Sequence, residues 1–138
     1  MLVLTRRGAK MADDMGTFQT DVELENPASP GARQHVSSVL VDTGAELSCF
    51  PAPVLEALGV AQQKRLRFRQ ADGSVFERWT GYAILHAAGT RTVDEVIFGE
   101  PEDIVLLGAR SLEGLNRRVD PVTKSLVDAG PVSLAVMA

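Results

Sequence analysis

Cysteine and long apolar runs are scarce in this sequence. Cys49 is the single cysteine, so no disulfide can form within the chain, and a lone thiol is most simply explained by a reducing compartment. Met1 to Leu4 are apolar, but Thr5-Arg6-Arg7 follow at once, so the roughly 7 to 15 apolar residues of a secretion signal are missing. No stretch approaches the ~18 apolar residues of a membrane-spanning helix. We therefore expect a cytoplasmic protein with no membrane partner.

Dense basic clusters are missing too. The formal net charge is -4 and the sequence pI is about 5.1, which is the wrong electrostatic character for binding phosphate backbones, so we expect no nucleic-acid partner. His35 and His86 have no Cys, Asp or Glu at metal-ligand spacing, which predicts ordinary strand residues and neither metal nor cofactor. The 138 residues suit one hydrophobic core, and we expect a flexible extension (1–15) followed by one domain (16–138).

Alternating and apolar segments predict many short strands. Phe18 to Glu25 alternates strictly, and His35 to Val41 follows a turn-rich loop at Asn26 to Gly31. Arg65 to Gln70 and Val75 to Thr80 flank an Asp-Gly pair, which is a strong hairpin signal. Further strands are expected at Tyr82 to His86, Val93 to Phe98, Ile104 to Leu107, Val119, Lys124 to Val127, and in the alternation of Val132, Leu134 and Val136. Short helices are expected at Pro53 to Leu58 and Ser111 to Leu115. The sequence predicts an all-β domain with one or two short helices.

The segment most indicative of chemistry is Val39-Leu40-Val41-Asp42-Thr43-Gly44-Ala45, an apolar strand that ends in a carboxylate, a hydroxyl and a glycine. A carboxylate at the end of a buried strand is costly to ionise unless it is hydrogen-bonded or takes part in a reaction. A single carboxylate cannot act at once as base toward a water and as acid toward a leaving nitrogen. The sequence contains no second Asp-Thr-Gly or Asp-Ser-Gly, so the second carboxylate is expected from another copy.

Three elements in this order resemble the retropepsin-like (retroviral-type) aspartic peptidases, especially their bacterial single-domain relatives. They are Asp42-Thr43-Gly44-Ala45 after an aliphatic strand, the hairpin around Asp72-Gly73, and Leu106-Leu107-Gly108 before a short helix. Trp79-Thr80-Gly81 and Val119-Asp120-Pro121 add to the likeness, which spans roughly Phe18 to Val127. The resemblance implies a closed, β-barrel-like fold and a homodimeric aspartic endopeptidase, a hydrolase of peptide bonds.

The resemblance also implies a role for each residue of the site. The two Asp42 carboxylates would share one proton over the attacking water, and Thr43 would hydrogen-bond across the dimer axis. Residues that would support the catalytic loop are Gly44, Ala45, Leu106, Leu107 and Gly108. A flap that closes over an extended polypeptide substrate would comprise Gln70, Ala71, Asp72, Gly73, Ser74 and Val75.

This chain departs from the family in three respects, one of which is a flap tip that holds one glycine, Gly73, with the acidic Asp72 beside it. Members of the family often have an anchoring arginine directly after the glycine that corresponds to Gly108. Here Ala109 occupies that position, and Arg110 comes next. Ala45 replaces a serine found in some members, so one hydrogen bond to the carboxylates is absent and we expect a less acidic pH optimum.

Several alternatives remain open. Asp42 could be an ordinary turn aspartate, and the chain could be a non-catalytic peptide-binding or scaffold dimer that retains the fold. It could also be a monomer that needs a partner protein to complete the site. Either Leu2 to Leu4 or Val132 to Val136 could form the dimer interface, and Cys49 is expected to pack as a small apolar residue behind the Asp42 loop.

Overall fold

The computed structural model describes residues 18–135, which form a mostly β structure with two short helices. The strands are β1 (Phe18–Asn26), β2 (Ser29–Val41), β3 (Ser48–Pro51), β4 (Lys64–Arg69), β5 (Val75–Ala87), β6 (Thr90–Gly99), β7 (Leu106–Leu107), β8 (Arg117–Asp120) and β9 (Ser125–Asp128). The helices are α1 (Ala52–Ala57) and α2 (Ala109–Leu115). The predicted all-β class with short helices is confirmed.

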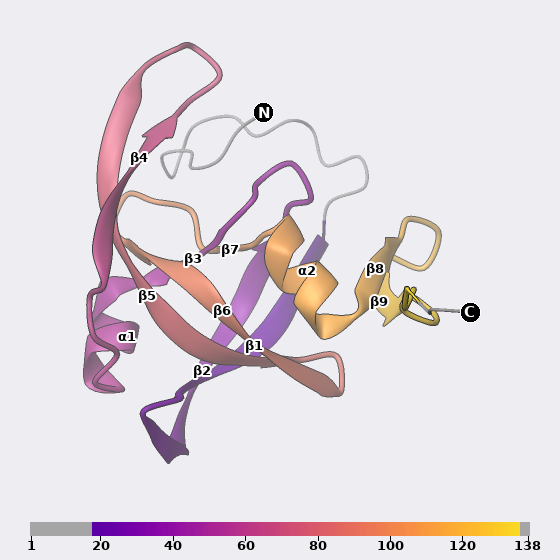
Figure 1. Cartoon of the computed structure of the whole chain (residues 1–138). Helices are drawn as coiled ribbons and strands as arrows, with labels where there is room; N and C mark the ends of the chain where they lie inside the picture. Colours follow the sequence, from indigo (N-terminus) through magenta and orange to yellow (C-terminus); the bar gives the residue numbers. More distant parts are fainter. Residues whose placement is uncertain (1–17, 136–138) are drawn as a thin grey trace.

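Seven strands form one mixed sheet in the order β1-β2-β7-β3-β6-β5-β4 (Figure 1). β2 pairs with β7, and β3 with β6, in parallel, whereas the other pairings are antiparallel. β1 also pairs with β5, so the pairings lead from β1 around the sheet and back to β1. β8 and β9 form a separate two-stranded hairpin beside α2. The short β7 therefore lies in the middle of the sheet, between β2 and β3.

The first predicted loop is shorter than expected. β1 ends at Asn26, and β2 already begins at Ser29, so the predicted loop from Asn26 to Gly31 is wrong in its second half. The Asn26 side chain accepts a hydrogen bond from the Ala28 amide (2.9 Å), which closes a tight turn. Gly31 lies within β2, and its amide donates to the carboxylate of Glu25 (2.7 Å) in place of a backbone carbonyl.

β5 is one strand where the sequence predicted two separated at Gly81. Gly81 marks a close approach of two backbones and not a break, because a Cβ there would overlap the carbonyl oxygen of Ala61. β3 was not predicted, and the expected strand from Ile104 to Leu107 is reduced to Leu106–Leu107. The hairpin at Asp72-Gly73 and both helices are confirmed within a few residues.

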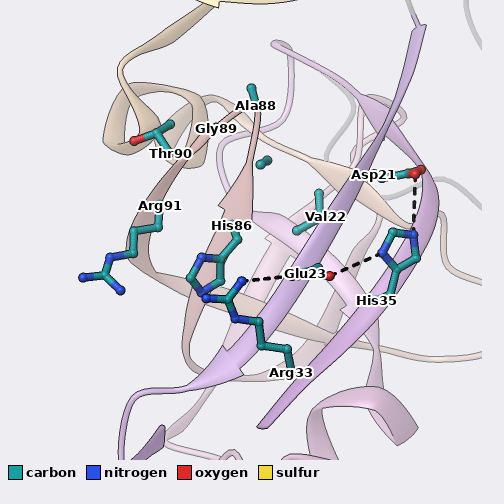
Figure 2. Close-up of a pocket in the computed structure, with 11 residues that line it drawn as sticks. Asp21, Val22, Glu23, Arg33, His35, His86, Ala88, Gly89, Thr90 and Arg91 are labelled. Carbon is teal, nitrogen blue, oxygen red and sulfur yellow. Dashed lines mark hydrogen bonds and ion pairs between the residues drawn. The ribbon is translucent and has the colours of Figure 1, made fainter. Parts of the chain in front are cut away.

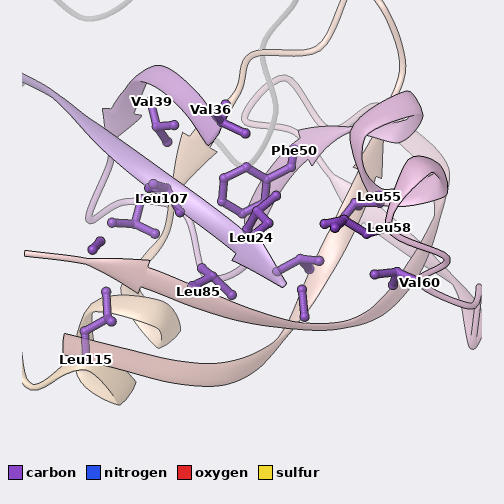
Figure 3. Close-up of a cluster of buried hydrophobic side chains, with 14 of the residues drawn as sticks. Leu24, Val36, Val39, Phe50, Leu55, Leu58, Val60, Leu85, Leu107 and Leu115 are labelled. Atoms are coloured by element: carbon purple, nitrogen blue, oxygen red, sulfur yellow. The ribbon is translucent and has the colours of Figure 1, made fainter. Parts of the chain in front are cut away.

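Two apolar clusters fill the described part of the chain. The larger one, shown in Figure 3, brings together β1, β2, β3, β5 and both helices, with Leu24, Phe50 and Leu85 fully buried at its centre. The smaller one packs the inner face of the β4–β5 hairpin against the segment after Asp42. Its buried members are Ala45, Leu47, Cys49, Phe68, Ile97 and Leu106. The strand β7 contributes to both clusters, with Leu107 in the larger and Leu106 in the smaller.

Near the end of the described chain, a turn from Asp120 to Thr123 joins β8 to β9. α2 ends at Asn116 in the left-handed conformation, with φ of 55°. The strand expected at Val132 and Leu134 is absent: both side chains are exposed and lie outside any strand. The predictions for Leu2 to Leu4, Val136 and the extension 1–15 concern residues outside the described part of the chain.

Candidate active site

Asp42 directly follows the last residue of β2, in the middle of the sheet. Its backbone amide donates to the carbonyl of Leu107 (3.0 Å), which continues the parallel pairing of Val41 with Leu107. Because β7 separates β2 from β3, the chain must cross over the end of β7 between these strands. The carboxylate is half-buried at that crossing, and Thr43 beside it is exposed.

The loop from Asp42 to Leu47 is held by its own backbone. The Gly44 amide donates to Oδ1 of Asp42 (2.9 Å), and the Ala45 amide donates to the Asp42 carbonyl (3.2 Å). The first bond orients the carboxyl group, and the second closes the backbone turn that follows it. Ala45 is fully buried and anchors the loop in the smaller cluster.

α2 binds this loop from the other side. The Ala109 amide donates to the Ala45 carbonyl (2.8 Å), and the Arg110 amide donates to the Glu46 carbonyl (3.0 Å). The first amides of a helix have no partner within it, so the loop satisfies donors that would otherwise be left unpaired. Segments predicted as catalytic loop and as its support are thereby brought together by backbone contacts.

Gly108 joins β7 to α2 and lies against the loop. A Cβ at Gly108 would come within 2.8 Å of the backbone carbon and oxygen of Leu47. Its amide donates to the hydroxyl of Ser48 (2.9 Å). Any residue can adopt the φ of -96° seen at Gly108, so backbone conformation does not require a glycine here. The close packing of the two backbones does.

A buried polar network, which the sequence analysis missed, supports this junction. The hydroxyls of Ser48 and Ser111 are 2.6 Å apart, and the Ser111 hydroxyl donates to Oδ2 of Asp94 (2.8 Å). Both serines are fully buried, so each hydroxyl needs a partner within the protein. The only signal in the sequence was Ser48 between the apolar residues Leu47 and Cys49. The segment is too short to show which face of a strand the serine occupies.

The β4–β5 hairpin projects beyond the sheet and contains the six predicted flap residues. In Figure 1 it rises at the upper left, at the same end of the molecule as the connection from β2 to β3. Its tip is closed by the Gln70 amide, which donates to the Ser74 carbonyl (2.8 Å). The amide and hydroxyl of Ser74 both donate to Oδ1 of Asp72, which lowers the pKa of that carboxyl group. Gly73 has φ of 89°, as an Asp-Gly turn requires.

Two aromatic side chains next to the hairpin tip pack in the cluster that holds the Asp42 loop. Phe68 of β4 and Phe76 of β5 stack with their ring centroids 5.6 Å apart. Phe68 is buried in the same cluster as Ala45, and Phe76 packs against that cluster. The hairpin tip itself is exposed from Ala71 to Val75.

Cys49 lies in this cluster behind the loop, as expected. It is 1% exposed, and its burial raises the pKa of the thiol far above the ordinary range. A thiol held in the neutral form is a poor nucleophile. Cysteine-based chemistry is therefore not supported by its surroundings.

A groove in the described chain does not include Asp42 among its lining residues. It has a volume of about 620 Å³ and lies between β1, β2 and the β5–β6 turn (Figure 2). Its charged side chains are mostly paired across strands: His35 lies 3.5 Å from Asp21, Arg33 lies 3.1 Å from Glu23, and His86 is 2.8 Å from Glu25. These pairs have a structural explanation, and residues 18–135 contain no group of three side chains arranged to hold a metal ion.

Comparison with known proteins adds no relative. No family model matches the chain, and no curated protein matches its sequence. Among residues 18–135, none of the helices has the length and apolar character needed to span a bilayer. The functional argument therefore rests on the residues and their geometry.

Proposed function

We propose that this protein is an aspartic endopeptidase of the retropepsin-like type, with a closed β fold, active as a homodimer in the cytoplasm. The observation that carries the proposal is the position of Asp42. Its carboxyl group lies at the end of β2, in a loop bound to Leu107 and to the first turn of α2. Such fixed geometry is what a reacting carboxylate requires, and a simple turn aspartate does not require it.

The chemistry follows from pairing two such carboxylates. One Asp42, ionised, accepts a proton from a water whose oxygen attacks the peptide carbonyl carbon. The other Asp42, protonated, donates its proton to the carbonyl oxygen, and collapse of the resulting diol transfers a proton to the leaving nitrogen. Two adjacent carboxylates share one proton at low cost, whereas ionising both is unfavourable. The second copy is needed because the sequence has a single Asp-Thr-Gly loop.

Two further features support this function. The β4–β5 hairpin projects at the end of the molecule where β2 ends (Figure 1), which supports a role as the flap over an extended polypeptide. Thr43 is exposed beside Asp42, where it is available to a second copy. Ala45 supplies no hydroxyl of its own to hydrogen-bond the carboxylate, so the less acidic optimum stays a prediction.

The test is cleavage of a mixture of unfolded proteins and peptides by the wild type, by Asp42→Asn, and by the wild type with a statine-type inhibitor. Asp128→Asn is a matched control, because Asp128 accepts a hydrogen bond from the Gly130 amide (2.7 Å) in the same way that Asp42 accepts one from Gly44. We expect cleavage to be lost in Asp42→Asn and retained in the control. Unchanged cleavage by Asp42→Asn would exclude the proposal.

Two alternatives have distinct outcomes. A non-catalytic peptide-binding or scaffold dimer would bind extended peptides without cleaving any of them. A monomer completed by another protein would remain at 14.8 kDa in sedimentation over a concentration series. The homodimer requires a species of twice that mass that dissociates on dilution.

A further inference from the structure

An ion pair joins the β4–β5 hairpin to the connection between β6 and β7. Arg78 of β5 binds Asp103 through two hydrogen bonds, from Nε to Oδ2 (2.7 Å) and from Nη2 to Oδ1 (2.9 Å). The Arg78 side chain is 15% exposed and that of Asp103 is 5% exposed. The hydrogen bonds to Asp103 raise the pKa of Arg78, so the arginine stays charged.

Asp103 is itself held firmly. Its Oδ2 also accepts a hydrogen bond from the Glu100 amide (2.8 Å), and its own amide donates to the Glu100 carbonyl (2.9 Å). The carboxylate of Glu100 lies 3.5 Å from Nη2 of Arg78. One arginine thus binds two acidic residues, Glu100 and Asp103, of a short turn that leads into β7, the strand whose Leu107 carbonyl binds Asp42.

Apolar packing is incomplete on the side of this turn that faces β3 and α1. A pocket of about 170 Å³ separates it from the end of β3 and the start of α1, with Phe50, Pro51 and Pro53 among the lining residues. Apolar contacts on that side are therefore incomplete, and the polar contacts to Arg78 define where the turn lies.

Arg78 also contacts the stacked aromatic pair of the hairpin, Phe68 and Phe76. Its guanidinium lies over the ring of Phe76, 4.8 Å from the centroid, and Phe76 stacks on Phe68. Phe68 shares its cluster with Ala45, the residue that anchors the Asp42 loop. A continuous set of contacts therefore runs from Asp103 through Arg78 and the two phenylalanines to the catalytic loop.

We propose that the Arg78–Asp103 pair is a latch that fixes the angle of the β4–β5 hairpin over the Asp42 loop, which makes both residues positioning residues for peptide hydrolysis. This role rests on the proposed function. A buried ion pair is a weak source of stability compared with apolar packing, whereas a two-pronged arginine bond fixes orientation. The latch holds the hairpin at Arg78, midway along its pairing, and leaves the tip free to open and close.

The test compares three variants with the wild type. Arg78→Lys keeps the charge but loses the two-pronged bond, and Arg78→Met/Asp103→Leu replaces the pair by apolar side chains of similar size, which guards against a charge left unpaired. Arg65→Lys is the matched control, because Arg65 binds Glu77 within the same hairpin (3.2 Å) while both side chains are about half exposed. The readouts are kcat and KM on a peptide that the wild type cleaves, the thermal midpoint, and amide hydrogen exchange of residues 68–76.

We expect kcat/KM to fall by at least about tenfold in Arg78→Lys and in the double variant, since small misplacements of a substrate-holding element are costly. Hydrogen exchange of residues 68–76 should accelerate by at least about tenfold in both, relative to the rest of the sheet. The control should stay within about twofold of the wild type in every readout.

Three results would overturn the latch. They are unchanged kinetics and exchange in both variants, a loss of activity that merely follows the unfolded fraction, or an equal effect of Arg65→Lys. If the wild type cleaves nothing, the proposed function and the reaction role fail together. Accelerated exchange in the Arg78 variants alone would then show that the pair holds the hairpin for another purpose.

Discussion

The amide of Gly108 donates a hydrogen bond of 2.9 Å to the hydroxyl of Ser48, where a Cβ on Gly108 would come within 2.8 Å of the Leu47 backbone. Two chain segments therefore meet backbone to backbone directly beneath the Asp42 loop. The contact sets the distance between β7 and β3, and through the Leu107 carbonyl it sets the position of Asp42. The geometry of the carboxylate thus depends on residues that never approach a substrate.

Gly108→Ala should destabilise the fold by about 1–3 kcal/mol, because the added methyl group meets backbone atoms that cannot move aside. It should also lower peptidase activity in the fraction that remains folded, since β7 must shift away from Asp42. Urea unfolding measures the first effect and kcat the second. Ala109→Gly, at the next position, removes a methyl group and should cost about 1 kcal/mol or less. Equal losses in the two variants would contradict the packing explanation.

Ser48→Ala should destabilise the protein by about 1–3 kcal/mol, because it leaves the buried Gly108 amide without its partner. Ser111→Ala should cost less, because Ser48 keeps its bond to the Gly108 amide and the carboxylate of Asp94 is half-buried and can bind water. The double variant should lose less than the sum of the two single losses. A double-mutant cycle in urea measures this coupling, and strictly additive losses would show that the serines do not act together.

The sequence predicted those elements whose pattern is long enough to define a face. Strict alternation identified β1, and Asp-Gly between two extended segments identified the β4–β5 hairpin. β3 was not predicted because its four residues show no alternation of apolar and polar side chains. β5 was predicted as two strands because a glycine such as Gly81 looks the same in the sequence whether it ends a strand or allows another backbone to approach. Local patterns cannot distinguish such cases, since the deciding contact comes from a distant segment.

The residues of the candidate site also fall into those that the sequence could predict and those that it could not. Asp42 and Gly108 could be located because each lies in a short motif after an apolar strand. Ser48, Ser111 and Asp94 could not, because their partners are set by how β3, β6 and α2 pack, and Ser48 and Ser111 are 63 positions apart. A buried hydroxyl carries no sequence signal of its own partner. Arg78 and Asp103 were overlooked for the same reason.

Glu25→Gln should remove a stability contribution that depends on pH. The hydrogen bond from His86, followed by the one from the Gly31 amide, lowers the pKa of Glu25, so folding is favoured while this carboxylate is ionised. The contribution is fully present above the unfolded value of about 4.3 and is lost as the pH falls through the lower folded pKa.

Thermal unfolding between about pH 3 and 7 measures this effect. The difference between wild type and Glu25→Gln should be constant near neutral pH and shrink below about pH 4.3. Glu23→Gln serves as control, because Glu23 is 43% exposed and pairs with Arg33 at the surface. Surface pairs contribute about 0–1 kcal/mol, so that variant should follow the wild type. A difference that grows toward acid pH would reverse the assigned sign.

Mixing wild type with Asp42→Asn tests whether each active site uses two copies of Asp42. After subunit exchange at equal amounts, about a quarter of the dimers are wild-type pairs, as random association of identical surfaces requires. Because the total number of dimers has doubled, activity should fall to about half that of the same wild-type protein alone. Asp128→Asn, added in the same amount, should not lower activity, since its Asp42 is intact. Activity that stays constant on adding Asp42→Asn, while sedimentation shows mixed dimers, would mean that one Asp42 suffices and that the carboxylates do not work as a pair.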